Sequence, residues 1–352
     1  MKVVFILPNL GAGGAERVVT ILSKMLAGEG IAVDIVMLFS NDVRYQIPEN
    51  VQLVSLNTGD MTLPERVKCL REYLIWQKRE HKKVIEIPFQ HNCLKYALLS
   101  AAGLGIRVIA CERNDPYQKG TSRKARLAAN IPYLLADRCV FQTPDARDYY
   151  FPPVRSKGKV IENPLVLPEE LVWQGQNSRR IVSVGRLEPQ KNQKMLIDAF
   201  SAFHQMHPEY ELDIYGEGFL REELQQQIDS LGLHEAVFLR GYSSEIHKNL
   251  SQANMFVLSS DYEGMSNALM EAIAIGVPVV TTDHPIGGAR MLIQDQVNGL
   301  MTPVGDSAAL CAAMDRLVRQ PDFAGTLGRN GIRIRERLEA GNIARQWMTL
   351  FG

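Results

Sequence analysis

The chain has 352 residues, which is long enough for two domains of ordinary size. Apolar residues make up 46% and charged residues 22%, as in a globular protein, and the formal net charge is zero, which argues against a nucleic-acid binder. The halves differ, however: residues 1–165 hold 23 Lys and Arg against 16 Asp and Glu, and residues 166–352 hold 16 against 23. Either the basic half meets an anionic partner or the asymmetry has no role.

The cysteines give no sign of a disulfide framework or a zinc site. The sequence has five, scattered and without a C-x-x-C pair: Cys69, Cys93, Cys111, Cys139 and Cys311. Such usage is typical of a reducing compartment. The opening MKVVFILPNL predicts a first strand rather than a signal peptide, and no apolar run approaches the ~20 residues that span a bilayer. We therefore expect a cytoplasmic protein that is peripheral, at most, on the inner face of the plasma membrane.

Short strand-like runs alternate with helical patterns along the first half. KVVFIL leads through a glycine loop into the helical pattern AERVVTILSKMLAGEG and then into the strand AVDIVML. Further strands are expected at QLVSL, KVIEI, RVIAC and RCVFQT. Alternating strands and helices predict a parallel sheet with helices on both faces.

The glycine loop NLGAGGAER, residues 9–17, is a weak signal for a phosphate-bearing ligand. It resembles a dinucleotide fingerprint but reads G-x-G-G instead of G-x-G-x-x-G, and no acidic residue follows the second strand at the usual spacing. Gly13 and Gly14 would still let a ligand approach the backbone closely. Gly14 is therefore a candidate donor-binding residue.

Two segments of the first half mix basic residues with Leu, Tyr or Trp. They are LPERVKCLREYLIWQKREHKK, residues 63–83, and YQKGTSRKARLAANIPYLLADR, residues 117–138. Basic amphipathic helices suit docking on an anionic membrane leaflet, here through Arg123, Lys124 and Arg126. A solvated helix face is the alternative for each segment.

The second half restarts the alternation after an irregular joint. The segment ENPLVLPEELVWQGQNSRR, residues 162–180, holds two early prolines and no clear periodicity. Strands are then expected at RRIVSVGRL, ELDIYG, AVFLRGY, NMFVLSS and VPVVTT. We predict two doubly wound domains, residues 1–168 and 169–352, with a final helix that could pack back on the first. Ligands of such sheets bind beyond the carboxyl ends of the strands, which would put the site in a cleft between the domains.

A glycine turn with two cations follows the first strand of the second half. In SVGRLEPQKNQKMLIDAF, residues 183–200, Gly185 opens the turn, and Arg186 and Lys191 precede the next helix. Two cations at the carboxyl end of a strand suit a diphosphate, and Arg186 can form paired hydrogen bonds. Alone the signal is weak, because such a turn is common on protein surfaces.

Two glutamates eight residues apart stand in SSDYEGMSNALMEAIAIGVPVVTTD, residues 259–283. Glu263 lies in the turn between a buried strand and a helix, and the backbone N–H groups that follow it would favour an anion. Glu271 lies ~80° around that helix, at ~100° per residue. A solvated surface position is a poor alternative for Glu271, because its neighbours are apolar and a buried carboxylate needs a partner.

Together these motifs resemble the glycosyltransferase family 4 enzymes. The resemblance rests on GGAER near the start, VGRLEPQKN at the centre, and EGMSNALMEAIAIGVPVV followed by VNGLMTP. It covers most of the chain, and the E-x7-E element is its most specific part. The resemblance implies the GT-B fold of two Rossmann-like domains facing across a cleft. It also implies retaining transfer from a nucleotide-diphosphate sugar, UDP being favoured, without a metal or other cofactor.

The resemblance also implies roles for individual residues. Glu263 would bind hydroxyls of the transferred sugar and Glu271 the ribose, while Arg186 and Lys191 neutralise the leaving diphosphate. Tyr242 is expected beside the nucleotide base. Backbone N–H groups that contact the phosphates would come from Met265, Ser266 and Asn267.

The sequence departs from the family pattern at two places. Many relatives carry a histidine after the strand that corresponds to RVIAC, where this chain has Arg113. We expect Arg113 and His91 on the acceptor side, although a structural histidine is at least as probable for His91. In HPIGGARML, Met291 stands where an acid is common, which leaves the phosphate contacts there in doubt.

Several functions stay open at this stage. The favoured one is transfer of a hexose or N-acetylhexosamine to a lipid-linked saccharide in surface polysaccharide or glycan assembly, with peripheral contact to an anionic membrane. A soluble acceptor and a non-catalytic nucleotide-sugar-binding protein are the alternatives. The broken glycine fingerprint and the E-x7-E element argue against an NAD-dependent dehydrogenase. A GT-B epimerase or phosphorylase is a nearer rival, although no lysine motif for a pyridoxal cofactor is evident. The sugar, the base and the linkage are not specified by the sequence.

Overall fold

The computed structural model describes residues 1–11 and 13–352 and divides into two compact units. Unit 1 comprises Met1–Val166 together with Leu338–Gly352, and unit 2 comprises Leu167–Arg337. Ala12, in the glycine loop, lies outside the described residues. The joint expected at residues 162–180 holds no helix and forms a single isolated bridge, between Leu165 and Glu339, before a strand begins at its last residue.

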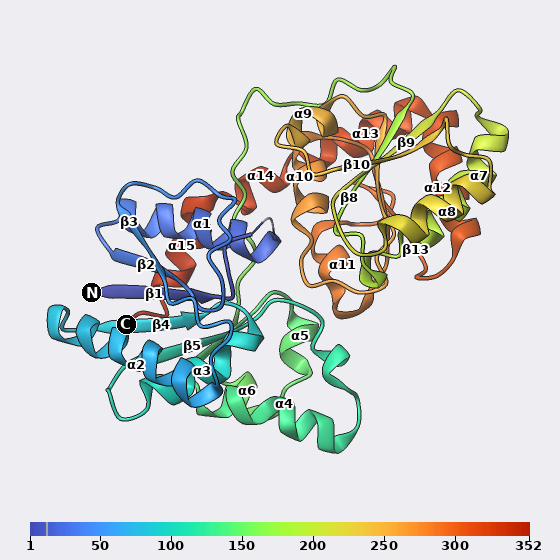
Figure 1. The fold of residues 1–352 in the computed structure, drawn as a ribbon. Helices are drawn as coiled ribbons and strands as arrows, with labels where there is room; N and C mark the ends of the chain where they lie inside the picture. The colour runs from blue at the N-terminus through green and yellow to red at the C-terminus, as the bar shows by residue number, and fades with distance from the viewer. Residues whose placement is uncertain (12) are drawn as a thin grey trace. The chain divides into compact units, whose positions relative to one another are not determined.

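Unit 1 is a seven-stranded parallel sheet in the order β3-β2-β1-β4-β5-β6-β7 (Figure 1). Its strands are β1 (Lys2–Leu7), β2 (Ala32–Met37), β3 (Val51–Ser55), β4 (Val84–Pro88), β5 (Arg107–Glu112), β6 (Arg138–Phe141) and β7 (Gly158–Val160). Its helices are α1 (Gly14–Gly28), α2 (Leu63–Glu80), α3 (His91–Ala101), η1 (Pro116–Lys119), α4 (Arg123–Leu135), α5 (Pro144–Asp148), α6 (Pro152–Arg155) and α15 (Ala340–Met348).

Helices cover both faces of this sheet because alternate side chains of each strand point to opposite sides. In β1, Phe5 packs into a core with α1 and α15, whereas Ile6 packs into a second core with α2, α3 and α4. The last helix is held by Trp347, which is buried and stacks on Phe89 with ring centroids 5.9 Å apart. Residues at the end of the chain therefore complete the core of the first unit.

Unit 2 is a six-stranded parallel sheet in the order β10-β9-β8-β11-β12-β13. Its strands are β8 (Arg180–Val184), β9 (Glu211–Tyr215), β10 (Val237–Gly241), β11 (Met255–Leu258), β12 (Val279–Thr282) and β13 (Leu300–Thr302). Its helices are η2 (Pro189–Lys191), α7 (Gln193–Met206), α8 (Arg221–Ser230), α9 (Ile246–Ser251), α10 (Asn267–Ile275), η3 (Pro285–Gly287), α11 (Gly288–Leu292), α12 (Ser307–Arg319), α13 (Pro321–Gly331) and α14 (Ile334–Arg337).

Two parallel α/β sheets confirm the predicted fold class. The strands expected from β-branched runs are all present, and β7 and β13 are additional short strands of three residues each. Within residues 1–11 and 13–352, no helix has the length and apolar character that crossing a membrane requires.

Glu86, in the middle of β4, provides a test of this core. It is buried, neither carboxyl oxygen has a hydrogen-bond partner among the described residues, and burial raises its pKa well above the usual value. The folded protein therefore holds Glu86 protonated, and the stability this allows is lost as pH rises from the ordinary glutamate pKa towards the raised one. We predict that Glu86→Gln removes a pH dependence of up to ~1.4 kcal/mol per pH unit in that window.

Urea unfolding of both proteins, from about pH 5 to about pH 8, measures this difference. The free energy of unfolding of the wild type should fall relative to that of Glu86→Gln as pH rises. Glu80→Gln, at an exposed position of α2, is the matched control and should keep the wild-type slope. Parallel curves for the wild type and Glu86→Gln would show that Glu86 is not held neutral.

Candidate functional site

Two turns that hold predicted donor-site residues of unit 2 lie where the strand order of the sheet reverses. Strands β8 and β11 are neighbours, but β9 and β10 continue on one side and β12 and β13 on the other. The turn with Arg186 and Lys191 follows β8, and the turn with Glu263 follows β11. Such a switch point is the usual ligand position in open parallel sheets.

Glu263 is the centre of a buried polar cluster at this switch point. The Lys191 ammonium donates to its carboxylate, the Ser260 hydroxyl donates over 2.7 Å and the Gln190 amide over 3.1 Å. The side chains of Glu263 and Lys191 are 8% and 14% exposed, so the ion pair is largely shielded from water. The structure thus brings together Glu263 and Lys191, to which the resemblance gave roles at the transferred sugar and at the leaving diphosphate.

The electrostatic balance at Glu263 keeps its carboxylate charged. Burial alone raises the pKa of Glu263, but the charge and hydrogen bond of Lys191 and the hydroxyl of Ser260 outweigh it, so the pKa lies below the usual value. Because the folded-state pKa is lowered, this group stabilises the fold above the ordinary glutamate pKa and the contribution is lost as pH falls through the lowered value. Near neutral pH, Glu263 is a hydrogen-bond acceptor only.

The turn that carries Lys191 is fixed by its neighbours. Asn192 adopts the left-handed conformation, with φ 44°, and its side chain caps α7 by accepting from the Met195 N–H. The same side chain donates to Asp261 over 2.7 Å, which joins this turn to the one after β11. A Cβ at Gly216 would lie 1.9 Å from the Gly185 carbonyl oxygen, so only glycine fits beside the start of the turn.

Arg186 and Tyr242 are more open than the buried pair. Arg186 is 60% exposed and donates to Glu188 over 3.0 Å. Tyr242 follows the carboxyl end of β10 and is 55% exposed. Both therefore present side chains to solvent at the carboxyl edge of the unit 2 sheet, where a ligand could contact them.

Helix α10 has a capping residue at its start and a glycine at its end. The Ser266 hydroxyl accepts from the Leu269 N–H at its start, and Gly276 ends it with φ 89°, a left-handed conformation suited to glycine. Met265 and Ser266 are buried and Asn267 is partly buried. These three residues, predicted to contact phosphate, form the first turn of the helix and its approach.

Glu271 has the partner that its burial demanded. Its side chain is 5% exposed, and one carboxylate oxygen lies 3.0 Å from the Nε2 atom of His247 in α9. The sequence analysis did not single out His247, because it lies 24 residues upstream on another helix. His247 and Glu271 form a second pair of polar side chains in unit 2, in addition to Lys191 and Glu263.

A buried histidine beside Glu263 also escaped the sequence analysis. His284 follows β12, is fully buried, and its Nε2 atom has no hydrogen-bond partner among the described residues. Burial lowers its pKa, while the nearby Glu263 carboxylate opposes that shift. The sequence does show that His284 closely follows a buried strand. In that segment, however, the sequence analysis considered only Met291.

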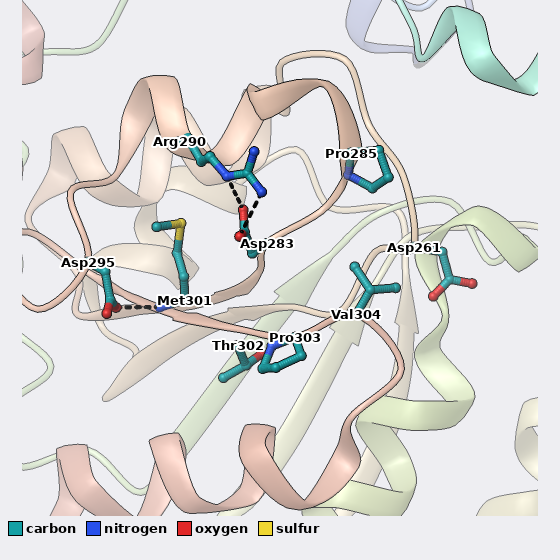
Figure 2. A pocket seen from close by; sticks show the side chains of 9 residues that line it. All are labelled: Asp261, Asp283, Pro285, Arg290, Asp295, Met301, Thr302, Pro303 and Val304. Atoms are coloured by element: carbon teal, nitrogen blue, oxygen red, sulfur yellow. Dashed lines mark hydrogen bonds and ion pairs between the residues drawn. The ribbon is translucent and has the colours of Figure 1, made fainter. Parts of the chain in front are cut away.

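A hollow of about 620 Å³ lies at the carboxyl ends of β11, β12 and β13 (Figure 2). Figure 2 shows the Arg290 guanidinium directed at Asp283, with Nε and Nη2 at 2.7 Å and 2.9 Å from its two carboxylate oxygens. Asp261 lines this hollow, yet none of the donor-site residues predicted from the sequence does so.

In unit 1 the strand order of the sheet reverses between β1 and β4, and the glycine loop follows β1. Gly14 is the first residue of α1, and Glu16 in that first turn is buried and accepts from the Gln90 amide over 2.7 Å. Gln90 precedes α3, so one hydrogen bond joins the loops after the two central strands.

The two candidate acceptor-side residues have different surroundings. Arg113 stacks on the Phe89 ring, 4.4 Å from its centroid, and donates to Asn163. Burial lowers the pKa of Arg113 to about 10. His91 starts α3, and loss of solvation, followed by the charge of Lys119, lowers the pKa of its ring. Nothing in these contacts assigns either residue to an acceptor.

The comparisons with known proteins agree with the motifs. Residues 173–334 match the family model described as "Glycosyl transferases group 1". Over 99% of the chain and 98% of the relative, the sequence is 25% identical to the GalNAc-alpha-(1->4)-GalNAc-alpha-(1->3)-diNAcBac-PP-undecaprenol alpha-1,4-N-acetyl-D-galactosaminyltransferase of Campylobacter jejuni. It is 28% identical to the N-acetylgalactosamine-N,N'-diacetylbacillosaminyl-diphospho-undecaprenol 4-alpha-N-acetylgalactosaminyltransferase of the same organism, over 86% of each chain.

Solved structures share the fold over nearly the whole chain. A mutant of S. aureus TarM in complex with UDP superposes with a TM-score of 0.85 at 14% identity, covering 100% of this chain and 99% of that one. Anabaena Alr3699/HepE in complex with UDP and glucose gives 0.80 at 20% identity, covering 99% and 98%. The two-sheet architecture is therefore the GT-B fold.

The buried pair makes Lys191 a sensitive position. We predict that Lys191→Met lowers the free energy of unfolding by ~3–5 kcal/mol, because it leaves the Glu263 carboxylate buried without its cation. Adding Glu263→Gln should recover part of the loss, because the remaining group is neutral. Urea unfolding of the wild type, of Lys191→Met and of the double variant measures these free energies of unfolding.

Lys194→Met is the matched control for this substitution. Lys194 pairs with Glu223 at the surface, where the side chains are 48% and 52% exposed, so its removal should cost less than ~1 kcal/mol. Equal losses for Lys191→Met and Lys194→Met would mean that burial does not strengthen the pair with Glu263.

Proposed function

We propose that this chain, which belongs to the glycosyl transferases group 1 family, transfers a hexose or N-acetylhexosamine from a UDP-sugar to a hydroxyl of a lipid-linked saccharide, with retention at the anomeric carbon. The observation that supports this most is the buried Glu263 carboxylate, held by Lys191, Ser260 and Gln190 at the strand-order reversal of unit 2. A charged acceptor beside two cations suits a sugar diphosphate, which offers hydroxyls and phosphates side by side.

In this proposal, each residue of the site contacts a different part of the donor. Glu263 accepts hydrogen bonds from hydroxyls of the transferred sugar, and Glu271 accepts from the ribose. Arg186 and Lys191 face the diphosphate, together with the backbone of Met265, Ser266 and Asn267, while Tyr242 lies beside the base. Lys191 thus links the sugar-binding carboxylate to the phosphate that leaves.

Charge stabilisation supplies the main rate enhancement in this proposal. As the bond between the anomeric carbon and the diphosphate oxygen breaks, negative charge grows on the phosphate, where Lys191 is already held by Glu263 and Arg186 adds a second cation. The acceptor hydroxyl attacks from the same face and passes its proton to the departing phosphate oxygen. Glu263 stays ionised and orients the sugar, which the Lys191 pair makes possible at neutral pH.

The acceptor assignment rests on the relatives and on charge. The two Campylobacter jejuni relatives are named for saccharides linked to undecaprenol diphosphate. Residues 1–165 have 23 Lys and Arg against 16 Asp and Glu, which suits a phosphate-bearing acceptor at an anionic membrane surface. His91 and Arg113 are the proposed acceptor-side residues. A glycosyltransferase acting on a soluble saccharide is the second candidate.

A substrate screen tests the proposal. Purified protein is incubated with radiolabelled UDP-sugars and, separately, with a polyprenyl-diphosphate-linked saccharide or its water-soluble counterpart. Transfer to the lipid-linked acceptor with an α-linked product is expected. Transfer to the soluble saccharide alone would favour the second candidate, and an inverted product would contradict the retaining mechanism.

The ribose assignment predicts weaker donor binding when Glu271 loses its charge. Glu271→Gln should weaken UDP binding by ~1–3 kcal/mol in calorimetry, because a charged acceptor is replaced by an amide. Glu222→Gln, in the exposed first turn of α8, is the control and should bind UDP as the wild type does. Unchanged affinity in Glu271→Gln would remove Glu271 from the nucleotide site.

The two cations predict that transfer needs no divalent ion. Activity should persist in excess EDTA, because Arg186 and Lys191 take the place of a metal at the diphosphate. Initial rates with and without chelator measure this. Loss of activity with EDTA and its return with magnesium or manganese would contradict the assignment.

A further inference from the structure

The outer face of helix α4 carries a stripe of large apolar side chains that the described residues of unit 1 leave largely exposed. Leu127, Ile131, Leu134 and Leu135 are 52%, 50%, 39% and 69% exposed. At ~100° per residue, their spacing of four, seven and eight positions puts all four on one side of the helix. A contiguous exposed apolar surface of this kind marks a binding surface.

The inner face of α4 is firmly attached, so the stripe is not a frayed helix. Tyr133 is buried and its hydroxyl lies 3.1 Å from a carboxylate oxygen of Glu112, the last residue of β5. Asn130 is buried and accepts from the Phe151 N–H over 2.8 Å. The helix thus presents its apolar stripe on a rigid support.

A hollow of about 350 Å³ opens beside the stripe, between α3, η1 and α4. Ala128 and Pro132 line it, and the helical spacing puts both next to Leu135 on the side of α4. Leu94, Phe39 and Tyr96 supply further apolar and aromatic wall. The stripe and the hollow are therefore one continuous apolar surface.

Cations stand at both parts of this surface. Lys95 and Lys119 line the hollow, and Lys119 forms a buried ion pair with Glu112, so Lys95 carries the net positive charge there. Arg123 and Lys124 are exposed at the start of α4. Arg126 is not available in the same way, since it donates to the Tyr149 carbonyl and lies over the Tyr149 ring at 5.2 Å, which corrects its expected place on a membrane surface.

We propose that the stripe of Leu127, Ile131, Leu134 and Leu135 and the hollow beside it form the binding site for a long-chain phosphate ester at the membrane surface. The stripe inserts shallowly among the acyl chains of an anionic leaflet, and the hollow receives the part of the hydrocarbon chain next to the phosphate. Lys95 pairs with that phosphate, and Arg123 and Lys124 with neighbouring lipid head groups. This inference rests on the proposed function and names the lipid-recognising element of unit 1.

Charge favours a lipid over a protein partner for this surface. The cations lie at the ends of the apolar surface, where the head groups of an anionic leaflet would meet an inserted helix. The surface also continues into a hollow of the size that a chain segment needs, which a flat protein interface would leave unfilled. A protein partner, including a second copy of this chain, is an outcome of the test.

Vesicle flotation with the full chain tests the stripe. The triple variant Leu127→Ser, Ile131→Ser, Leu135→Ser should bind vesicles of phosphatidylcholine with about one-third phosphatidylglycerol at least ~10-fold more weakly than the wild type. The control variant Met206→Ser, Leu231→Ser, Val297→Ser removes three comparably exposed side chains from unit 2 and should float as the wild type does. Wild-type protein that fails to float, or equal flotation of both variants, would overturn the proposal.

Light scattering of the same proteins without lipid separates the remaining possibility. A wild type that forms dimers, which the stripe variant abolishes, would assign the surface to protein contact and overturn the proposal. UDP binding by calorimetry shows that each variant retains a folded unit 2. UDP binding depends on the donor site alone. A wild type that does not bind UDP would therefore contradict the proposed function without bearing on the lipid site.

A second variant tests the hollow while leaving the stripe intact. Ala129→Trp should fill the hollow, keep vesicle flotation, and raise the KM for a polyprenyl-diphosphate-linked saccharide at least ~10-fold, with little change for a short water-soluble counterpart. Leu99→Trp, on the exposed surface of α3, is the control and should alter neither KM. An equal KM change for long and short acceptors would contradict a chain-binding role.

Discussion

A charged carboxylate in a buried position sets the arrangement of the turns at the carboxyl ends of β8 and β11 in unit 2. Glu263 remains ionised because Lys191 and Ser260 offset the effect of its burial, and Gln190 adds a further hydrogen bond. Each of these residues comes from a turn that follows one of two adjacent strands. Moving either turn would leave a buried charge unpaired, at a cost of several kcal/mol. The left-handed Asn192, its bond to Asp261 and the absence of a side chain at Gly216 all keep these turns in place. The site is therefore rigid before any ligand arrives, which is what stabilising developing charge requires.

Unit 1 uses the same kind of buried pair for a different end. Glu112 accepts from Lys119, Tyr133 and Tyr150 at the carboxyl end of β5, and this cluster fastens α4 to the sheet. With its polar contacts satisfied inwards, the helix can present apolar side chains outwards without loss of order. In unit 2 the buried pair lies at the proposed donor site, whereas in unit 1 it supports a surface.

Much of the fold and part of the site could be predicted from the sequence, for physical reasons that also explain the omissions. Parallel strands buried on both faces are continuous apolar runs, so β1 or β11 is evident, whereas β7 and β13 are too short to show a period. The cap and the end of α10 follow from Ser266 and Gly276, because those signals are local. The sequence indicated that a buried Glu271 needs a partner, but it did not identify His247 as that partner. Contacts between helices far apart in sequence leave no local pattern. Arg126 was wrongly assigned to a membrane surface for the same reason. Its contacts with Tyr149 depend on tertiary packing, which the sequence does not show.

The two crossings of the chain between the units impose an order of events during synthesis. Unit 1 is interrupted at Val166 and resumes only at Leu338, after all of unit 2 has been made. Until α15 leaves the ribosome, Phe89 lacks the Trp347 ring that stacks on it, and the sheet face that α1 and α15 share is covered only by α1. The second unit in the sequence can therefore finish folding before the first, and the nascent first unit keeps the part of its sheet face that α15 will cover exposed until the end of elongation. A chaperone that binds exposed apolar strands would find its target in this nascent first unit rather than in the second.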